Sequence, residues 1–207
     1  MISGTIAGSS SFTVYPLGEI TITRPSYSYY YIAYSPSTAS GTMWIASSIL
    51  ATPVSYQISS YSGMLKFSDS YPQYLSFESC TWRRIETNIP LFEESSVFAN
   101  CSTLQKADLY SCTSLSTNAF LYCRSLLQIS LPMCGYIGTG AFRYCSSLSI
   151  ITIGYSSVCS LGSDAFYNTQ ITSSTGRIYV PASLVSAYKS APNWSYFSAI
   201  IQSYPGL

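Results

Sequence analysis

Apolar side chains recur with a regular period through the second half of the chain. Phe98, Phe120 and Phe142 are separated by one constant interval, and Phe166 follows after a slightly longer one. Each of the first three Phe residues is followed by Cys at +3, Leu at +6, a small or apolar residue at +9 and an aliphatic residue at +11. Agreement at so many positions over three consecutive units indicates a repeat architecture.

The spacing within one repeat predicts a strand on one side of the unit and a tight turn on the other. An alternating pair such as Ile129 and Leu131 is typical of a short strand whose two apolar side chains point inward. The segment from Phe120 to Leu126 has an apolar residue at every third position, which favours a helical or 3₁₀ turn. One unit cannot bury its own apolar face, so we expect a β-rich, leucine-rich-repeat-like solenoid whose strands form a parallel sheet. The predicted core residues are Phe98, Cys101, Leu104, Leu109, Phe120, Cys123, Leu126, Ile129, Leu131, Phe142, Cys145, Leu148, Ile151, Ile153 and Phe166.

Polar residues between the inward positions of each strand predict the outer face of the sheet. Asp108, Ser130 and Thr152 hold this position in three successive repeats. Residues 178–181 repeat the pattern of residues 129–132 and are interpreted as the last strand, with Tyr179 at the outward position. We expect these four side chains to lie on an exposed binding face.

The repeat divides the chain into three expected regions: a small N-terminal β-rich attachment module at 1–58, the solenoid at 59–181 and a C-terminal helical cap at 182–207. Proline and glycine separate the N-terminal segments with β-forming composition, which are predicted strands at 12–15, 20–23 and 27–34. Residues 65–67 are a candidate for an earlier strand of the solenoid. Tyrosines at 29–31 predict either an exposed aromatic interface or alternate packing into a core.

The cap is predicted because a solenoid must cover its terminal apolar face. Pro181 suits a helix start, and Leu184, Val185 and Tyr188 follow on one face. A second segment has apolar residues at helical spacing, namely Trp194, Phe197, Ile200 and Ile201. Trp194 has two interpretations, packing on the last coil or contact with a ligand.

The repeat unit resembles the BspA-type leucine-rich repeat. The resemblance is carried by residues 119–132, Ala-Phe-Leu-Tyr-Cys-Arg-Ser-Leu-Leu-Gln-Ile-Ser-Leu-Pro, and by residues 137–142, Ile-Gly-Thr-Gly-Ala-Phe. Residues 176–189 and 193–197 are similar to the ends of such repeat proteins from gut bacteria and their phages. The resemblance implies a surface recognition module without catalytic residues, found in adhesins and in phage-borne proteins.

Composition narrows the class of partner. Charged residues make up 8% of the chain, against roughly a quarter in typical soluble domains. Apolar residues make up 47%, which excludes the pattern of intrinsic disorder. A net charge of +1 cannot neutralise a run of phosphates, so nucleic acid is not an expected partner. Serine and 20 tyrosines suit either a binding face or simply exposed β-structure and turns.

The cysteines follow the repeat rather than a metal site or a disulfide pattern. Cys101, Cys112, Cys123, Cys134 and Cys145 are evenly spaced at half of the repeat period. They therefore form two columns of the solenoid. Zinc sites use close cysteine pairs, often with histidine, and the chain has no histidine. We expect reduced, buried thiols, and neither a metal nor another cofactor.

No combination of residues in the sequence predicts catalysis. Without histidine, Ser-His-Asp and Cys-His arrangements are impossible. Glu86, Asp108 and Asp164 are isolated carboxylates, and no phosphate-binding glycine loop is present. No run reaches the about 18 apolar residues of a membrane span, and residues 1–10 do not have the pattern of a secretion signal. The chain is therefore not predicted to be an enzyme or to insert into a membrane.

These expectations lead to a functional hypothesis. The chain is predicted to be a phage virion component, in the tail fibre or on the capsid surface, that displays its repeat domain for host binding. The N-terminal module would contact other virion or surface proteins, and the solenoid a host-surface glycan or protein. Homo-oligomers are compatible with this hypothesis. Two alternatives remain open: a secreted, cell-surface bacterial adhesin, and a structural decoration or spacer protein.

Overall fold

The structure is a computed structural model. It describes the strand segments 2–5, 11–17, 30–36, 40–46, 53–57, 62–67, 74–76 and 82–87, and the continuous segments 95–173 and 175–204. Side chains are described for residues 82–87, 95–173 and 175–204. The predicted strand at 20–23, Tyr29 and Cys80 lie outside the described residues.

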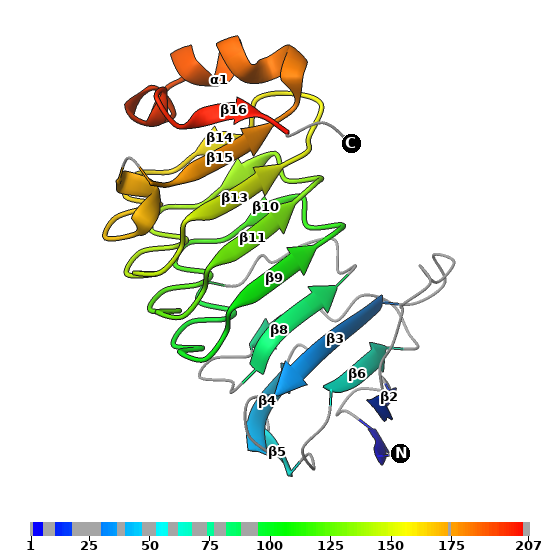
Figure 1. The fold of residues 1–207 in the computed structure, drawn as a ribbon. Helices are drawn as coiled ribbons and strands as arrows, with labels where there is room; N and C mark the ends of the chain where they lie inside the picture. The colour runs from blue at the N-terminus through cyan, green and yellow to red at the C-terminus, as the bar shows by residue number, and fades with distance from the viewer. Residues whose placement is uncertain are drawn as a thin grey trace.

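A ten-stranded sheet runs along the length of the molecule (Figure 1), in the order β1-β2-β6-β3-β8-β9-β11-β13-β15-β16. Its C-terminal part is parallel, as the repeat predicted. The six parallel strands are β8 (Trp82–Thr87), β9 (Lys106–Leu109), β11 (Gln128–Leu131), β13 (Ile150–Ile153), β15 (Arg177–Val180) and β16 (Ile201–Ser203).

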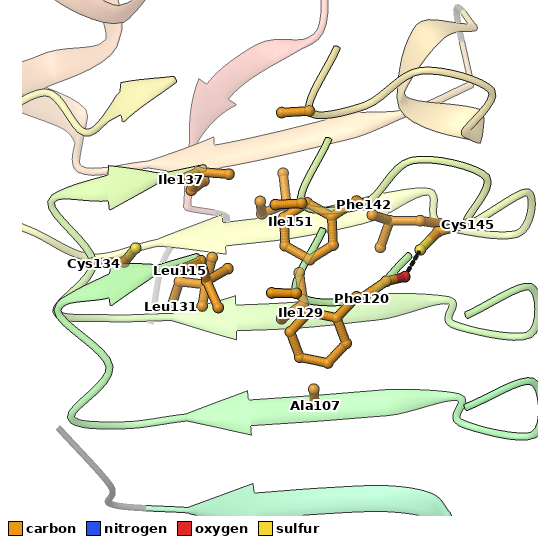
Figure 2. Close-up of a cluster of buried hydrophobic side chains, with 14 of the residues drawn as sticks. Ala107, Leu115, Phe120, Ile129, Leu131, Cys134, Ile137, Phe142, Cys145 and Ile151 are labelled. Atoms are coloured by element: carbon orange, nitrogen blue, oxygen red, sulfur yellow. Dashed lines mark hydrogen bonds between the residues drawn. The ribbon is translucent and has the colours of Figure 1, made fainter. Parts of the chain in front are cut away.

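The strands align in the register that the repeat period requires. Ile129 of β11 lies between Ala107 of β9 and Ile151 of β13. The side chains of all three are buried, and their rows form one wall of the core (Figure 2). Beside these strands, the Ser149 hydroxyl donates to the carbonyl of Leu127, one repeat or 22 residues earlier. The predicted solenoid with a parallel sheet is confirmed.

A second, shorter parallel sheet forms another side of each coil. It contains β10 (Ser114–Leu115), β12 (Tyr136–Ile137) and β14 (Ser160–Leu161). Leu115, Ile137 and Leu161 are buried in it. Each of these coils therefore contributes one strand to each sheet, and the core lies between them.

The phenylalanines stack on the third side of the coil, where the chain makes its tight turns. The ring centroids of Phe98 and Phe120 lie 4.9 Å apart, and those of Phe120 and Phe142 lie 5.6 Å apart. The backbone N–H of Phe120 donates to the carbonyl of Ala141 in the next coil at 2.7 Å. Stacked rings and backbone hydrogen bonds thus join neighbouring coils. All fifteen predicted core residues are buried.

The cysteine columns are part of this core. The six cysteines of the described region are buried and free. The Cys123 thiol donates to the carbonyl of Phe98 at 3.0 Å, and the Cys145 thiol to that of Phe120 at 2.9 Å (Figure 2). Each of these thiols therefore fills space as a small apolar group and also satisfies a backbone carbonyl.

The N-terminal strands extend the sheet with antiparallel pairing. β2 (Ser11–Leu17) covers the expected strand at 12–15, and β3 (Tyr30–Pro36) covers part of the segment 27–34. β3 pairs antiparallel with β8, while β1 (Ile2–Thr5) pairs with β2. A separate three-stranded antiparallel sheet consists of β5 (Pro53–Gln57), β4 (Ser40–Ala46) and β7 (Tyr74–Ser76).

The strand β6 (Ser62–Phe67) includes the candidate strand at 65–67. It lies between β2 and β3 and pairs antiparallel with both, so it does not continue the parallel repeat. The parallel array begins at β8, and the boundary of the N-terminal module at residue 58 stays a prediction.

The cap closes the C-terminal end of the solenoid. It contains the 3₁₀ helices η2 (Ala182–Leu184) and η3 (Ser195–Phe197) around α1 (Val185–Ser190); a further 3₁₀ helix, η1 (Gln170–Thr172), lies in the last coil. The Trp194 indole N–H donates to the carbonyl of Cys159 at 2.6 Å, and the Cys159 N–H donates to the Tyr188 hydroxyl at 2.9 Å. Among the described residues, none of the helices has the length and apolar character that a membrane span requires.

Two expectations for the cap were resolved by this packing. Trp194 is fully buried, so its indole packs on the last coil and is not available to a ligand. The expected helical placement of Ile201 was wrong. Ile201 lies in β16 beside Ile178 of β15, because the strand register continues the apolar row of the core.

Candidate functional site

The predicted outer face of the sheet is a row of four neighbouring residues. Ser130 lies beside Asp108 on one side and Thr152 on the other, and Thr152 lies beside Tyr179. They alternate along their strands with buried residues such as Ile129, so they face away from the core. Ser130, Thr152 and Tyr179 are half-buried.

The expectation that Asp108 is exposed was wrong. The residue is buried, with its side chain 8% exposed. Arg84 Nη2 lies 3.2 Å from Asp108 Oδ2, and Lys106 Nζ lies 3.3 Å from the same oxygen. Strand β8 brings Arg84 to this position from 24 residues upstream. The carboxylate is thus neutralised and covered by cations.

A second surface feature, which sequence reasoning missed, lies on the turn side of the coils. The rings of Tyr122 and Tyr144 stack with centroids 4.7 Å apart and an interplanar angle of 4°. Tyr167 of the next coil meets Tyr144 edge-on at 5.6 Å. The Arg143 guanidinium lies 5.2 Å from the centroid of Tyr144 and 5.1 Å from that of Tyr167, and Arg124 lies 5.5 Å from that of Tyr122. We call these five residues the tyrosine–arginine row.

The backbone beneath this row adopts a conformation that tyrosine disfavours. Tyr122 and Tyr144 have φ angles of 61° and 63°, in the left-handed region. Asn100 and Asn168 hold the same position in the flanking coils, and asparagine adopts this region more readily. A residue with a Cβ costs about 1–2 kcal/mol there. The recurrence of tyrosine two positions after Phe120 and Phe142 was the sequence signal for the row.

A cleft opens where the row meets the cap. It lies between residues 161–173 of the last coil and residues 193–200 of the cap, with a volume of about 590 Å³. Pockets for small ligands have volumes of roughly 300–1,000 Å³. Tyr167 and Tyr196 both line the cleft and are 50% and 85% exposed. Tyr167 therefore belongs to both the row and the cleft.

Polar groups of the cleft are available to a ligand. Asp164 lines it and forms no side-chain hydrogen bond or ion pair with any described residue. Asn193 donates its side-chain amide to the carbonyl of Leu161 at 2.7 Å, which leaves its side-chain oxygen as an acceptor. Within the described residues, no group of three or more His, Cys, Asp or Glu side chains could hold a metal ion. The arrangement offers polar groups and aromatic surface to a ligand.

An open solenoid with a parallel strand in each coil places the protein in the class of leucine-rich-repeat proteins. The family model described as "BspA type Leucine rich repeat region (6 copies)" matches residues 72–191, more than half of the chain. The chain belongs to this family. No curated protein and no solved structure matches it. Domains of this family generally mediate protein or surface interactions without catalysis, and are typical of surface and extracellular proteins.

Proposed function

We propose that this protein recognises a molecule on a cell surface and performs no catalysis. The observation that carries the proposal is an array of tyrosines on the surface of the stacked coils, half-buried at Tyr122 and Tyr144 and exposed at Tyr167 and Tyr196, which extends from the tyrosine–arginine row into the cleft beside the cap. Tyrosine gives a large, amphipathic contact area at low entropic cost, because only two side-chain torsions become fixed. Repeat stacking keeps these rings at set distances before a partner arrives, which lowers the cost of binding.

The outer face of the sheet is a second candidate contact surface. Ser130, Thr152 and Tyr179 form a row of hydroxyl groups there, next to the charge cluster around Asp108. This row suits a polar partner that lies flat along the sheet. Arg84 and Lys106 are occupied with carboxylates, so this face offers hydroxyl groups more than free charge.

Within the recognition class we favour a phage virion component that binds a bacterial host. The support is the similarity of residues 176–189 and 193–197 to the ends of phage-borne and gut-bacterial repeat proteins. The N-terminal strands would attach the chain to other virion proteins, with the solenoid on the virion surface facing a host glycan or protein.

A secreted bacterial adhesin is the alternative, and a homo-oligomer is compatible with both. Neighbouring genes for capsid and tail proteins would favour the virion role, and a neighbouring cell-wall anchor gene would contradict it.

Binding of the labelled full-length chain to a panel of gut bacterial strains tests recognition against the third possibility, a structural spacer. We expect saturable binding to a subset of strains, measured by flow cytometry. Two variants locate the surface: Tyr196→Ala alters the cleft and Thr152→Lys alters the sheet face. Absence of binding to every strain would support the spacer and contradict recognition.

A further inference from the structure

We propose that the cleft between the last coil and the cap binds a neutral oligosaccharide, and that the tyrosine–arginine row extends this site along the solenoid. The inference deepens the proposed recognition function, because it names a site and a class of ligand. It depends on features of the last coil and the cap that the repeat does not explain: Asp164, Tyr167, Asn193 and Tyr196.

The chemistry of the cleft matches the two sides of a sugar ring. A pyranose presents an apolar face of C–H groups and a rim of hydroxyl groups. Tyr167 and Tyr196 supply exposed aromatic surface on which the C–H face can pack. The Asp164 carboxylate can accept hydrogen bonds from two hydroxyl groups, and the hydroxyl of Ser163 can donate or accept.

The backbone at Asp164 holds the carboxylate in a turn of the last coil. Its φ angle is 53°, and Gly140 holds the equivalent position one coil earlier with a φ of 62°. The carboxylate has no partner among the described residues, unlike that of Asp108, which two cations neutralise. An unpaired acceptor beside two exposed tyrosines is a group that a ligand can use.

The charges around the cleft favour a neutral ligand. Neither lysine nor arginine is among the described residues that line it, so phosphate and other anions would meet Asp164 without a compensating cation. A cationic ligand could pair with the Asp164 carboxylate, but it would meet repulsion beside Tyr167. One face of Tyr167 is already occupied by the Arg143 guanidinium, whose positive charge repels a second cation. A sugar without net charge avoids both penalties.

The walls of the cleft are held in place before any ligand binds. The Asn193 amide is bonded to the carbonyl of Leu161, and the Trp194 indole to that of Cys159. Phe166 of the coil and Phe197 of the cap meet edge-on with centroids 5.4 Å apart. These contacts join the two sides of the cleft, so binding does not have to order them.

The tyrosine–arginine row extends from the cleft along the solenoid, with one tyrosine in each of three successive coils. Tyr144 follows Tyr167 at 5.6 Å and Tyr122 follows Tyr144 at 4.7 Å, between ring centroids. Both rings are half-buried, so each offers an edge or part of a face rather than a full pocket. An oligosaccharide anchored in the cleft gains further contacts along this row, and a longer chain should therefore bind more tightly than a monosaccharide.

The experiment is a screen of the full-length chain against an array of neutral oligosaccharides built from glucose, galactose, mannose, fucose and N-acetylated hexosamines. The tightest binder is then titrated by calorimetry. We expect Tyr167→Ala and Tyr196→Ala each to weaken binding at least tenfold. Asp164→Asn should weaken binding as well, because asparagine tolerates the same φ angle but removes the charge. The matched control is Tyr136→Ala, a tyrosine 43% exposed on β12 and outside the cleft, which should bind unchanged.

Three outcomes would overturn the inference: no neutral oligosaccharide binds, the cleft variants bind like the parent, or Tyr136→Ala loses as much affinity as they do. Circular dichroism and thermal melting verify that each variant is folded. The recognition function has a separate readout, because binding to bacterial cells is measured independently. If both tyrosine variants of the cleft still bind cells, the proposal that the cleft is the recognition site fails and the proposed recognition function stands. If the protein binds sugar but no cells, the proposed recognition function fails and the sugar site stands.

Discussion

Buried cysteines of the core fill space and also donate hydrogen bonds to backbone carbonyls. Each of the six thiols of the described region is fully buried in the stacked coils. Burial, together with the neighbouring thiols, raises the pKa of Cys112 and Cys123 well above the usual thiol value. The reactive form of cysteine is the thiolate, so a thiol with a raised pKa and no access to solvent is chemically inert.

We predict that the native protein resists thiol reagents. In a Cys80→Ser variant, the six remaining cysteines should react with Ellman's reagent at pH 8 only as fast as the protein unfolds. All six should react rapidly in guanidinium chloride, which serves as the control. Rapid labelling of the folded variant would contradict the buried columns.

The same thiols determine a pH dependence of stability. Unfolded cysteines lose their protons above about pH 8.5, whereas Cys112 and Cys123 keep theirs in the folded state. The unfolded state then binds fewer protons, so the free energy of unfolding decreases as the pH rises above this value. Equilibrium denaturation at pH 7 and pH 10 measures this loss.

At two glycines, neighbouring coils approach so closely that a Cβ could not fit without a shift of the backbone. A Cβ added at Gly138 would lie 2.6 Å from the backbone carbon of Ser116 in the preceding coil. At Gly162, one coil later, it would lie 2.5 Å from the backbone nitrogen of Thr139. Backbone atoms cannot move aside without separating the strands of the short sheet.

We therefore predict that Gly138→Ala lowers the free energy of unfolding by about 1–3 kcal/mol, the usual cost of overpacking a tight contact. Gly135→Ala is the matched control. The nearest atom to its added Cβ would be a side-chain atom of the Tyr155 ring, at 3.3 Å, and the nearest backbone atom given is Thr113 O at 3.8 Å, so a change of about 0.5 kcal/mol or less is expected. Urea denaturation of both variants measures the difference, and equal effects would show that coil spacing is not set at Gly138.

The molecule as a whole is a one-dimensional stack whose two ends differ. At the N-terminal end, antiparallel strands continue the ten-stranded sheet beyond β8 (Figure 1). At the C-terminal end, Trp194 and Tyr188 pack edge-on, with ring centroids 5.2 Å apart, over the last coil. Each coil contacts only its neighbours, so loss of the cap exposes the apolar interior of the coil beneath it.

We predict that Trp194→Ala lowers the free energy of unfolding by about 3–5 kcal/mol, the usual range for a buried aromatic residue. The exposed end should also promote self-association, which light scattering detects. Tyr196→Ala, in the same cap but 85% exposed, should change stability by about 0.5 kcal/mol or less. A monomeric Trp194→Ala variant of unchanged stability would show that the cap is dispensable.

The repeat period alone predicted the solenoid, its parallel strands and its core. Phe120, Ile129 and Leu131 could be assigned to the interior because each has equivalents one repeat before and one repeat after it, and stacking requires equivalent residues to meet. Burial of the cysteine columns followed from the same period. These features form within one coil, and each repeat of the sequence forms the same features again.

Other features depend on contacts that do not recur from one repeat to the next, and these became visible only in the folded chain. Asp108 is buried because β8 brings Arg84 beside it, and β6 lies between β2 and β3 through pairing with strands far away in sequence. The cleft exists because the chain reverses in the cap and brings Tyr196 back to the coil of Tyr167. No spacing in the sequence encodes these contacts, because each occurs once.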